Sequence, residues 1–463
     1  MKKLFLFIGL VAFLATACEK EEMVTPFEQQ EDPLAEVIRI AQEGAAMLGD
    51  AETRSAVGRR IDRSRISCKI NPATRAGESD DTLYYVVNYA DNAGFAIVSA
   101  NEEAPDGARL IAVTESGSYT AGEQTENEGF NMYMDMVESA NVYGDLIIDT
   151  TLLKPEIPKN SYYEDIVTYS PWYGVAPKLQ VKWGQGSTSW YDDDLNHHNN
   201  EYDPSYPYNK YCYTIAGDSI CPAGCVAVAI AQIMSYHRKP SSYMLTYDGS
   251  DRIIPLDWNA LNSYVGGYGY SWTASAGDAI ALWFREIGKR AMMTYKPGGS
   301  NSDVYKAREC FATFGYDQLP AVGYNYATIQ SELASGRPVY VRGARLVVKD
   351  NGSTEYKGHA WVADGYKTRT EYVETYEVFP SPFGEEFDQR ELRGQYSTTY
   401  RYVHYNWGYD GDCNGFFKDN VFRLNNASQE AGGYDNTGYY NGDNRNYMYD
   451  VLMITGINNS NTY

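Results

Sequence analysis

Histidine and basic residues are scarce in this 463-residue chain. Only five histidines occur, so few side chains are available as a general base. Lys and Arg number 39 against 61 Asp and Glu, and the net charge of −22 argues against a nucleic-acid partner, whose phosphates would be repelled. After the first 18 residues, no apolar run approaches the roughly 20 residues of a membrane-spanning helix.

The N-terminus predicts export. Two lysines, an apolar stretch and small residues ending at Cys18 are typical of a signal peptide over residues 1–18. Cys18 also suits lipoprotein processing, in which the thiol is acylated, although Ala15 stands where a lipobox usually has Leu. The following Glu-Lys-Glu-Glu resembles the surface-export tag of Bacteroidetes lipoproteins, and we assign residues 19–30 to a tag and tether. We expect an outer-membrane or cell-surface lipoprotein, and secretion is the alternative.

Hydrophobic patterning divides the remainder into two units. Helical spacing over residues 32–48, a hairpin formed by 83–89 and 94–99, a strand at 110–113 continued by 117–119, and a helix at 130–142 predict a small α+β domain over residues 31–145. Residues 146–170 contain prolines and little periodicity, and we interpret them as a linker with a cleavage site. Residues 171–463 place helices first, at 225–237 and 276–294, and strands afterwards, at 338–342, 345–349, 359–366, 400–406, 416–424 and 449–457. This order predicts an α+β domain with a cleft between two lobes.

One segment of the N-terminal unit has the opposite charge to the rest of the chain. Residues 51–75 contain seven basic side chains against Glu52 and Asp62. This segment is either a docking surface for an acidic neighbouring domain or a solvated loop.

Seven cysteines are compatible with two arrangements. If Cys18 is lipidated, the remaining six could form three disulfides in an oxidising compartment, or one could remain a free nucleophile. The spacing of Cys221 and Cys225 does not match the usual zinc patterns, and a disulfide between them would block a nucleophile at either position. The positions left unassigned are Cys68, Cys212, Cys221, Cys310 and Cys413.

Cys225 is the strongest candidate nucleophile. It opens the run 226–234, in which Gln232 is the single polar residue, and so predicts a buried helix. The positive end of the helix dipole should lower the pKa of a thiol at this position, and the thiolate is the reactive form. The alternative is a core cysteine or half of a disulfide.

The histidines narrow the choice of base. His237 lies twelve residues along the same helix, about 18 Å from Cys225, and cannot reach it. His197 and His198 lie in a polar loop, which leaves His359, at the start of a strand after Gly358, and His404, in a strand of Tyr and Val. An amide at Asn406 could hold an imidazolium, Trp407 could shield that bond, and Gln185 could donate to an oxyanion.

The order Gln, Cys, His, Asn-Trp-Gly is that of papain-like cysteine peptidases, and the chain resembles the streptopain family within that group, including interpain-like members. The resemblance covers nearly the whole mature chain. It rests on segments 182–186, 207–209, 224–237, 299–300, 314–316, 336–340, 358–360 and 405–408, and on 94–99 in the N-terminal unit. It implies a two-lobed papain-like catalytic domain, with a helical lobe followed by a β-rich lobe, over residues 171–463.

The same resemblance implies roles for individual residues. Cys225 would be the nucleophile and His359 the general base and acid. Gln185 and the Cys225 backbone N–H would bind the oxyanion, Asn406 would orient His359, and Trp407 would cover that pair. Ser300 and Gly358 would line the substrate cleft. The resemblance further implies polypeptide substrates, no metal or cofactor, and an inhibitory prodomain over residues 31–145.

The chain departs from the family at two insertions. Residues 186–206 separate Gln185 from the Pro207-Tyr208-Asn209 motif, and their Asp192–Asp194 and His197–His198 could bind a cation or form a solvated loop. Residues 367–400 lengthen the segment between His359 and Asn406. Their alternating pattern predicts an added hairpin over 368–376 and 396–405.

The expected function is therefore an exported cysteine endopeptidase made as a zymogen. The alternative from another class is a non-catalytic binding or inhibitory protein on a papain-like scaffold. A lesser alternative is a transglutaminase-like acyl transferase, which shares Cys-His chemistry.

Overall fold

The computed structural model describes residues 34–49, 59–71, 82–143, 161–186, 189–191, 197–199, 203, 206–247, 250–266, 274–348, 353–382, 388–423 and 451–458. The chain divides into two compact units, Met1–Ala35 and Glu36–Tyr463. Cys18 and the predicted tag lie outside the described residues. In the second unit, the described helices are too short or too polar to cross a membrane.

We name the predicted N-terminal domain the prodomain and the domain over residues 171–463 the catalytic domain, after the roles that the resemblance implies. The prodomain contains the predicted helices and hairpin together with one added strand. Helix α1 (Ala35–Ala45) confirms the first helix, and β2 (Thr82–Tyr89) and β3 (Phe95–Ser99) form the antiparallel hairpin. The short α2 (Asp106–Arg109) leads into β4 (Leu110–Thr114), and α3 (Glu128–Tyr143) confirms the last helix. Residues 117–119 do not form the expected strand, since only an isolated bridge joins Gly117 to Ala93.

The added strand, β1 (Ile61–Ile70), contains much of the basic segment and pairs with β2. Two cations of the basic segment contact the prodomain itself: Arg60, just before β1, is 3.4 Å from Asp91, and Lys69 in β1 is 3.1 Å from Glu138. These ion pairs bind the basic strand within its own domain. They do not support the predicted docking onto an acidic neighbour.

A single twisted sheet runs through both domains. Among the described residues its main path is β1-β2-β3-β4-β15-β14-β13-β12-β16-β11, so the prodomain strand β4 lies beside β15 (Gly415–Lys418). The register pairs Gly415 with Thr114 and Phe417 with Ala112. A Cβ at Gly415 would lie 2.2 Å from the Val113 carbonyl oxygen, so this close approach requires glycine. The prodomain is thus joined to the catalytic domain by backbone pairing as well as by side chains.

The helical lobe surrounds α4 (Cys225–His237), which is buried along almost its whole length because it is apolar on all sides. The other described helices of this domain are α5 (Trp258–Ser263), α6 (Ala274–Arg290), α7 (Val304–Thr313) and α8 (Tyr326–Ala334). A separate hairpin is formed by β9 (Ser242–Tyr247) and β10 (Ser250–Pro255). Rings of Trp183, Trp283 and Phe284 pack with α4 in one core.

The β-rich lobe has longer strands than the sequence indicated. The two strands predicted at 338–342 and 345–349 are one strand, β12 (Val339–Val348). The sheet is completed by β13 (Thr354–Phe379), β14 (Gln389–Asn406), β16 (Leu452–Ile454) and the two-residue β11 (Val322–Gly323). The strand predicted at 416–424 ends at Lys418, and a 3-10 helix, Asp419–Arg423, follows it.

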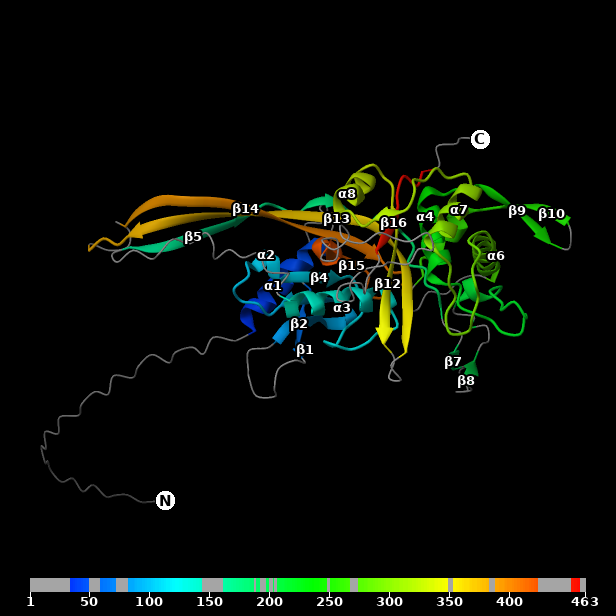
Figure 1. The fold of residues 1–463 in the computed structure, drawn as a ribbon, viewed down its shortest axis with the longest axis horizontal. Coiled ribbons are helices and arrows are strands. Elements are labelled where there is room, and N and C mark those ends of the chain that lie inside the picture. Colours follow the sequence, from blue (N-terminus) through cyan, green and yellow to red (C-terminus); the bar gives the residue numbers. More distant parts are fainter. Residues whose placement is uncertain are drawn as a thin grey trace, which may run out of the picture. The chain divides into compact units, whose positions relative to one another are not determined.

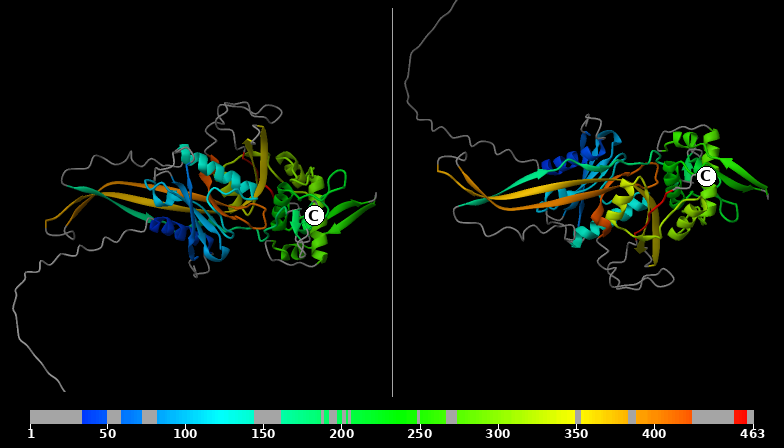
Figure 2. Two further views of the ribbon diagram at one scale, coloured as in Figure 1. Left: turned by 90° about the horizontal axis from the view of Figure 1, so that it is seen from below. Right: turned by 90° about the horizontal axis from the view of Figure 1, so that it is seen from above.

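The insertion at 367–400 forms the predicted hairpin, as the far ends of β13 and β14, which project as a long arm (Figure 1). Strand β5 (Tyr162–Tyr169) pairs with β13 from Glu371 to Val378, and β6 (Tyr173–Val175) pairs nearer its base. Figure 2 shows β5 running beside the hairpin from two further sides. Within the predicted linker, Tyr162–Tyr169 therefore form a strand, because the inserted hairpin supplies this segment with a partner strand.

The insertion at 186–206 is described only in part. Strand β7 (Ser189–Tyr191) pairs with β8 (His197–Asn199), with Tyr191 opposite His197. Asp192–Asp194 lie outside the described residues. In the part of the chain that is described, no group of three or more metal-ligating side chains converges.

Replacing Gly415 with Ala should separate the prodomain strand from the catalytic sheet. The added methyl group would meet backbone atoms of Val113 and Thr114, which cannot rotate away. We expect trypsin to cut the prodomain of G415A at least tenfold faster than that of the unchanged chain. Gly394→Ala is the matched control, because a Cβ there meets no atom within 4 Å and Gly394 also lies in a strand of this sheet. Equal cutting rates for G415A and G394A would contradict the expectation.

Candidate active site

Cys225 occupies the first position of α4, as predicted, and only 9% of its surface is exposed. Gly224 precedes it with φ = 87°, a left-handed conformation that glycine adopts without strain. A Cβ at Gly224 would lie 2.9 Å from the backbone oxygen of Ser300. The turn into α4 is therefore packed tightly against the segment that contains Ser300.

The conformation of this turn is fixed by the Pro207-Tyr208-Asn209 motif. Asn209 Oδ1 accepts a hydrogen bond of 2.7 Å from the backbone N–H of Ala223, two residues before the nucleophile. The Tyr208 hydroxyl donates a 2.6 Å hydrogen bond to Asp410 in the loop after Trp407. The sequence alone assigns this motif no role, whereas in the structure it connects the turn before Cys225 with the Asn-Trp-Gly loop.

His359 lies on β13, opposite Gly343 of β12, and its ring is almost completely buried. Its Nε2 atom is 2.7 Å from the backbone oxygen of Trp407. Although His359 and Cys225 both belong to the described residues, no hydrogen bond joins the imidazole to the thiol. The predicted pair is in the same region but is not assembled as a catalytic dyad.

Asn406 makes different contacts from those expected. Its Oδ1 accepts hydrogen bonds from Gln232 Nε2 at 3.0 Å and from the Gly408 backbone N–H at 3.2 Å. Its Nδ2 donates to the Val181 backbone oxygen at 3.0 Å. The acceptor at His359 is therefore the Trp407 carbonyl rather than the Asn406 side chain. Asn406 instead accepts a hydrogen bond from the backbone N–H of Gly408, the residue that follows this carbonyl.

Gln232 is the residue that the sequence reasoning missed. It lies two turns after Cys225 on α4, is fully buried, and donates both to Asn406 and to the Trp183 backbone oxygen at 2.8 Å. The signal in the sequence is that Gln232 is the single polar residue in the apolar run 226–234. A buried NH2 group requires acceptors, and its acceptors here belong to the two segments beside the site.

The remaining predicted residues lie close by. The Gln185 backbone N–H donates to the Gly408 oxygen at 3.2 Å, so the predicted oxyanion donor adjoins the Asn-Trp-Gly loop. Ser300 is buried against Gly224. Gly358 is exposed next to His359 on β13, and a Cβ there would make only ordinary contacts, the nearest 3.5 Å away. Close packing within this structure therefore does not account for a glycine at 358.

The prodomain covers the site through the N-terminus of α3. A Cβ at Gly129 would lie 2.6 Å from His359 Cδ2 and 2.5 Å from Trp407 Cε3, so the helix backbone rests directly on both rings. The adjacent Glu128 forms a 2.9 Å ion pair with Lys357, two residues before His359. Asn127 Nδ2 donates to the Asp412 oxygen at 3.3 Å. These contacts leave no room for a peptide substrate over the imidazole.

Burial under the prodomain changes the electrostatics of both reactive groups. Desolvation raises the pKa of the Cys225 thiol, and nearby backbone N–H groups, including that of Ala360, offset this only in part. Desolvation also lowers the pKa of His359 to about 4, against the raising effects of the Trp407 carbonyl and Glu128. The prediction that the helix terminus lowers the thiol pKa is therefore wrong for this prodomain-covered form, because the loss of water outweighs the dipole. The neutral thiol is the unreactive form of the cysteine, and a neutral imidazole has no proton to give to a leaving amine.

His404, the other histidine considered, belongs to the domain boundary. Its Nδ1 is 2.6 Å from Asp364 Oδ1, and its Nε2 is 3.3 Å from Glu115 Oε1 of the prodomain. The two carboxylates outweigh the cost of burial and raise the pKa of His404 to about 10. His404 is therefore a charged contact between domains and not the partner of Cys225.

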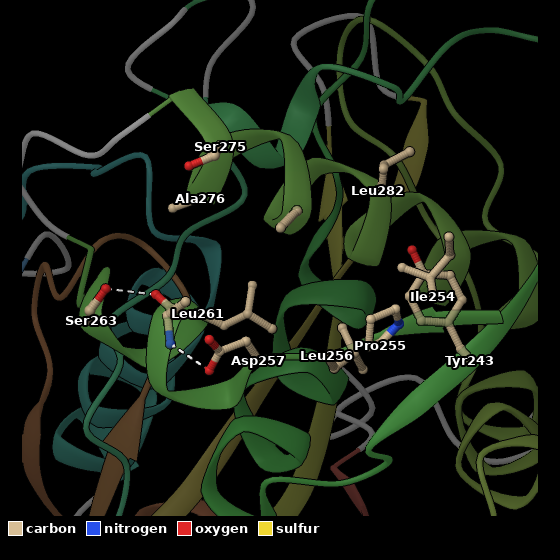
Figure 3. Close-up of a pocket in the computed structure, with 12 residues that line it drawn as sticks. Tyr243, Ile254, Pro255, Leu256, Asp257, Leu261, Ser263, Ser275, Ala276 and Leu282 are labelled. Atoms are coloured by element: carbon tan, nitrogen blue, oxygen red, sulfur yellow. Dashed lines mark hydrogen bonds between the residues drawn. The ribbon is translucent and has the colours of Figure 1, made fainter.

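A separate pocket lies in the helical lobe. Its volume is about 320 Å³, and Figure 3 shows it between the β9–β10 hairpin and helices α5 and α6. Apolar side chains such as Ile254, Leu261 and Leu282 form much of its lining, and Asp257 faces it while capping α5. It contains none of the predicted site residues.

Comparison with known proteins finds similarity to one peptidase family and one protease-inhibitor family. Residues 202–417 match the peptidase C10 family, and residues 51–140 match the Spi protease inhibitor family. Streptopain of Streptococcus pyogenes is 24% identical over 409 residues, which cover 82% of this chain and 83% of streptopain. The thiol protease/hemagglutinin PrtT of Porphyromonas gingivalis is 24% identical over 402 residues, covering 80% of this chain but only 38% of that protein.

Two solved structures of one protein are also similar. A fragment of prointerpain A from Prevotella intermedia aligns with a TM-score of 0.46 and 20% identity, covering 84% of this chain and 98% of the fragment. Active interpain A aligns with a TM-score of 0.35 over 61% of this chain and 94% of its own.

The matched families define a cysteine peptidase that carries an inhibitor-type prodomain. More specifically, residues 202–417 are similar to the streptopain-like peptidase C10 family.

The chemical state of Cys225 predicts how fast it is alkylated in the intact chain. Because its pKa is raised, the thiolate fraction should be small at neutral pH and should still be rising above pH 9. We expect iodoacetamide to modify Cys225 at least 100-fold more slowly in the intact chain than after prodomain removal when both are measured at pH 6.5. Mass spectrometry of the peptide that contains Cys225 gives both rates. Similar rates in the two forms would contradict the latent state described here.

Proposed function

We propose that this chain is the zymogen of an exported cysteine endopeptidase in which Cys225 and His359 become the catalytic dyad once the prodomain leaves. One observation carries the proposal: the backbone of α3 at Gly129 lies on His359 and Trp407, while Cys225 opens a buried helix on the other side of the site. A purely structural scaffold would not require a helix to cover these rings.

In the proposed reaction the Cys225 thiolate attacks the carbonyl carbon of the scissile peptide bond. Gln185 Nε2 and the Cys225 backbone N–H donate hydrogen bonds to the resulting oxyanion. As the C–N bond breaks, the His359 imidazolium gives its proton to the departing amine and a thioester remains. His359 then takes a proton from water, the hydroxide attacks the thioester carbon, and the Cys225 sulfur leaves as thiolate.

Removal of the prodomain would favour this chemistry electrostatically. Loss of α3 exposes the imidazole to water, which removes the cause of its lowered pKa and restores its capacity to hold a proton. A charged imidazolium near the thiol would in turn lower the pKa of Cys225. We place Ser300 and Gly358 beside the substrate, because Ser300 adjoins the nucleophile turn and Gly358 is exposed next to His359.

The activating cut is proposed to fall before Tyr162. The eight residues of β5 are hydrogen-bonded to β13, and a protease needs an extended strand that is free of other partners. Strand β5 would therefore stay with the catalytic domain and begin its N-terminal segment. This narrows the cleavage region from the predicted 146–170 to its first part.

Comparing the intact chain with its Cys225→Ala variant tests the peptidase proposal. We expect the unchanged chain, incubated under mild reduction, to shorten to a stable fragment that begins before Tyr162 and to degrade casein. The variant should stay whole and inactive, because it retains the fold but has no nucleophile. Intact mass measured over time gives both results.

The same experiment separates the alternatives. Casein hydrolysis at equal rates by both chains would exclude Cys225 as the nucleophile. If the unchanged chain stays inactive even after an added protease removes the prodomain, the non-catalytic binding protein becomes the better description. Incorporation of an amine into casein without cleavage would favour the acyl transferase.

We further propose that the chain is anchored to the outer membrane through a lipid on Cys18. The support is the signal-like segment before Cys18 and the Lys-and-Glu-rich residues after it. Expression in a lipoprotein-processing bacterium fed with labelled palmitate should label the unchanged chain and not Cys18→Ala. The Cys68→Ala variant is the control for general thiol acylation, since Cys68 is exposed. An unlabelled wild-type chain found free in the medium would support secretion instead.

A further inference from the structure

Glu115 of the prodomain occupies a cationic site on the catalytic domain. It follows β4 directly, and its two carboxylate oxygens face different cations: Oε1 is 3.3 Å from His404 Nε2, and Oε2 is 3.5 Å from Lys182 Nζ. Both cations come from the catalytic domain, and His404 is almost completely buried. The catalytic domain therefore supplies both cations of the site that binds the Glu115 carboxylate.

The charge on His404 does not depend on the prodomain alone. Asp364, which is 1% exposed, approaches the other ring nitrogen at 2.6 Å, and its second oxygen accepts the Leu179 backbone N–H at 2.9 Å. Asp364 thus fixes the ring so that Nε2 faces the domain boundary. When the prodomain departs, Nε2 and Lys182 lose their carboxylate partner and the Asp364 contact stays.

A strand edge lies next to these cations. Strand β15 pairs with β14 on one side, and its other side is occupied by the prodomain strand β4. Beyond the paired residues, the Glu115 backbone N–H donates to the Asn414 oxygen at 2.8 Å, and Ser116 Oγ donates to the Gly411 oxygen at 3.1 Å. Prodomain removal leaves these backbone groups without partners, at an edge where Gly415 permits close approach of another chain.

We propose that release of the prodomain opens an exosite on the catalytic domain, in which the β15 edge and the His404–Lys182 cations bind an extended polypeptide segment whose aliphatic residues are followed by a glutamate. The inference rests on the proposed function, since it requires that the prodomain be removed. The ligand is a segment of a protein substrate, held away from the bond to be cut.

The chemistry of this ligand is given by the segment that fills the site in the zymogen. The five residues of β4 are Leu-Ile-Ala-Val-Thr, all buried, and Glu115 comes next. Backbone pairing with β15 supplies affinity, and the apolar residues together with the carboxylate supply specificity, as in other cases of strand addition. A carboxylate fits this site because His404 Nε2 and Lys182 Nζ would otherwise have no anion between them.

The exosite adjoins the catalytic loop without including the proposed catalytic groups. Lys182 is three residues before Gln185, and His404 is two residues before Asn406. A substrate bound here would be held near the cleft, which raises its local concentration. We therefore expect the exosite to lower KM for proteins that carry such a segment and to leave kcat nearly unchanged.

Peptide binding to the processed enzyme tests the proposal. The full chain is allowed to process, the released prodomain is separated, and Cys225 is alkylated so that the probe is not digested. The probe is a dye-labelled peptide with the sequence of residues 110–117, and the comparison peptide carries Gln in place of the glutamate. We expect fluorescence anisotropy to give an at least tenfold lower Kd for the glutamate peptide.

Two proteins serve as controls. Lys182→Gln should reduce the difference between the peptides to threefold or less, and this side chain is partly exposed, so the fold should be kept. The unprocessed Cys225→Ala chain should bind neither peptide, because its own β4 fills the site.

The outcomes distinguish the exosite from the peptidase proposal. An enzyme that cleaves casein but binds both peptides equally, or binds neither, overturns the exosite alone. Equal binding by the processed and unprocessed chains also overturns it. A wild-type chain that never sheds its prodomain or cleaves casein overturns the proposed function, and the exosite with it.

Discussion

Backbone pairing between β4 and β15 is the contact on which the latent architecture depends. It extends the catalytic sheet by the four prodomain strands and so fixes where α3 lies. Two glycines make the geometry possible, one on each side: Gly415 lets the strands approach, and Gly129 lets the helix rest on His359 and Trp407. A side chain at either position would have to displace backbone or a buried ring. Inhibition therefore follows from the way the sheet is completed.

Charge reinforces this pairing, and the contributions are unequal. Carboxylates of the prodomain meet cations of the catalytic domain at Glu43–Arg369, Glu115–His404 and Glu128–Lys357. The Glu128–Lys357 pair is partly exposed, and such pairs contribute about 0–1 kcal/mol. Removing one partner of a buried pair costs about 3–5 kcal/mol, so the contact at His404 should dominate. The lowered pKa of Glu115, about 2, agrees with this ranking, since His404 and Lys182 overcome the effect of burial.

The inserted arm belongs to the prodomain interface as well as to the catalytic domain. Tyr400 and Tyr402, near the base of the arm, share a hydrophobic core with α1, β2 and β4 of the prodomain. Tyr402 donates a 2.8 Å hydrogen bond to the Leu110 oxygen, and Gly107 has no side chain where Tyr400 packs. Arg369 lies over the rings of Tyr169 and Trp172 and also reaches Glu43. The insertion thus lengthens a hairpin and also pairs with β5, the strand that follows the prodomain in the sequence.

The sequence by itself determined what local patterns can encode. Apolar periodicity located α1, α3, α4 and the arm hairpin, and the scarcity of histidine reduced the base to His359 or His404. Tertiary structure decided which groups meet. Only the fold showed that the Trp407 carbonyl, rather than Asn406, is the acceptor at His359, that Gln232 ties the nucleophile helix to Asn406, and that burial opposes the helix dipole at Cys225. The fold also showed that β5 pairs with β13 and that His404 contacts the carboxylates of Asp364 and Glu115. Desolvation and hydrogen bonding between distant segments depend on which surfaces the folded chain brings together, and no local spacing contains that information.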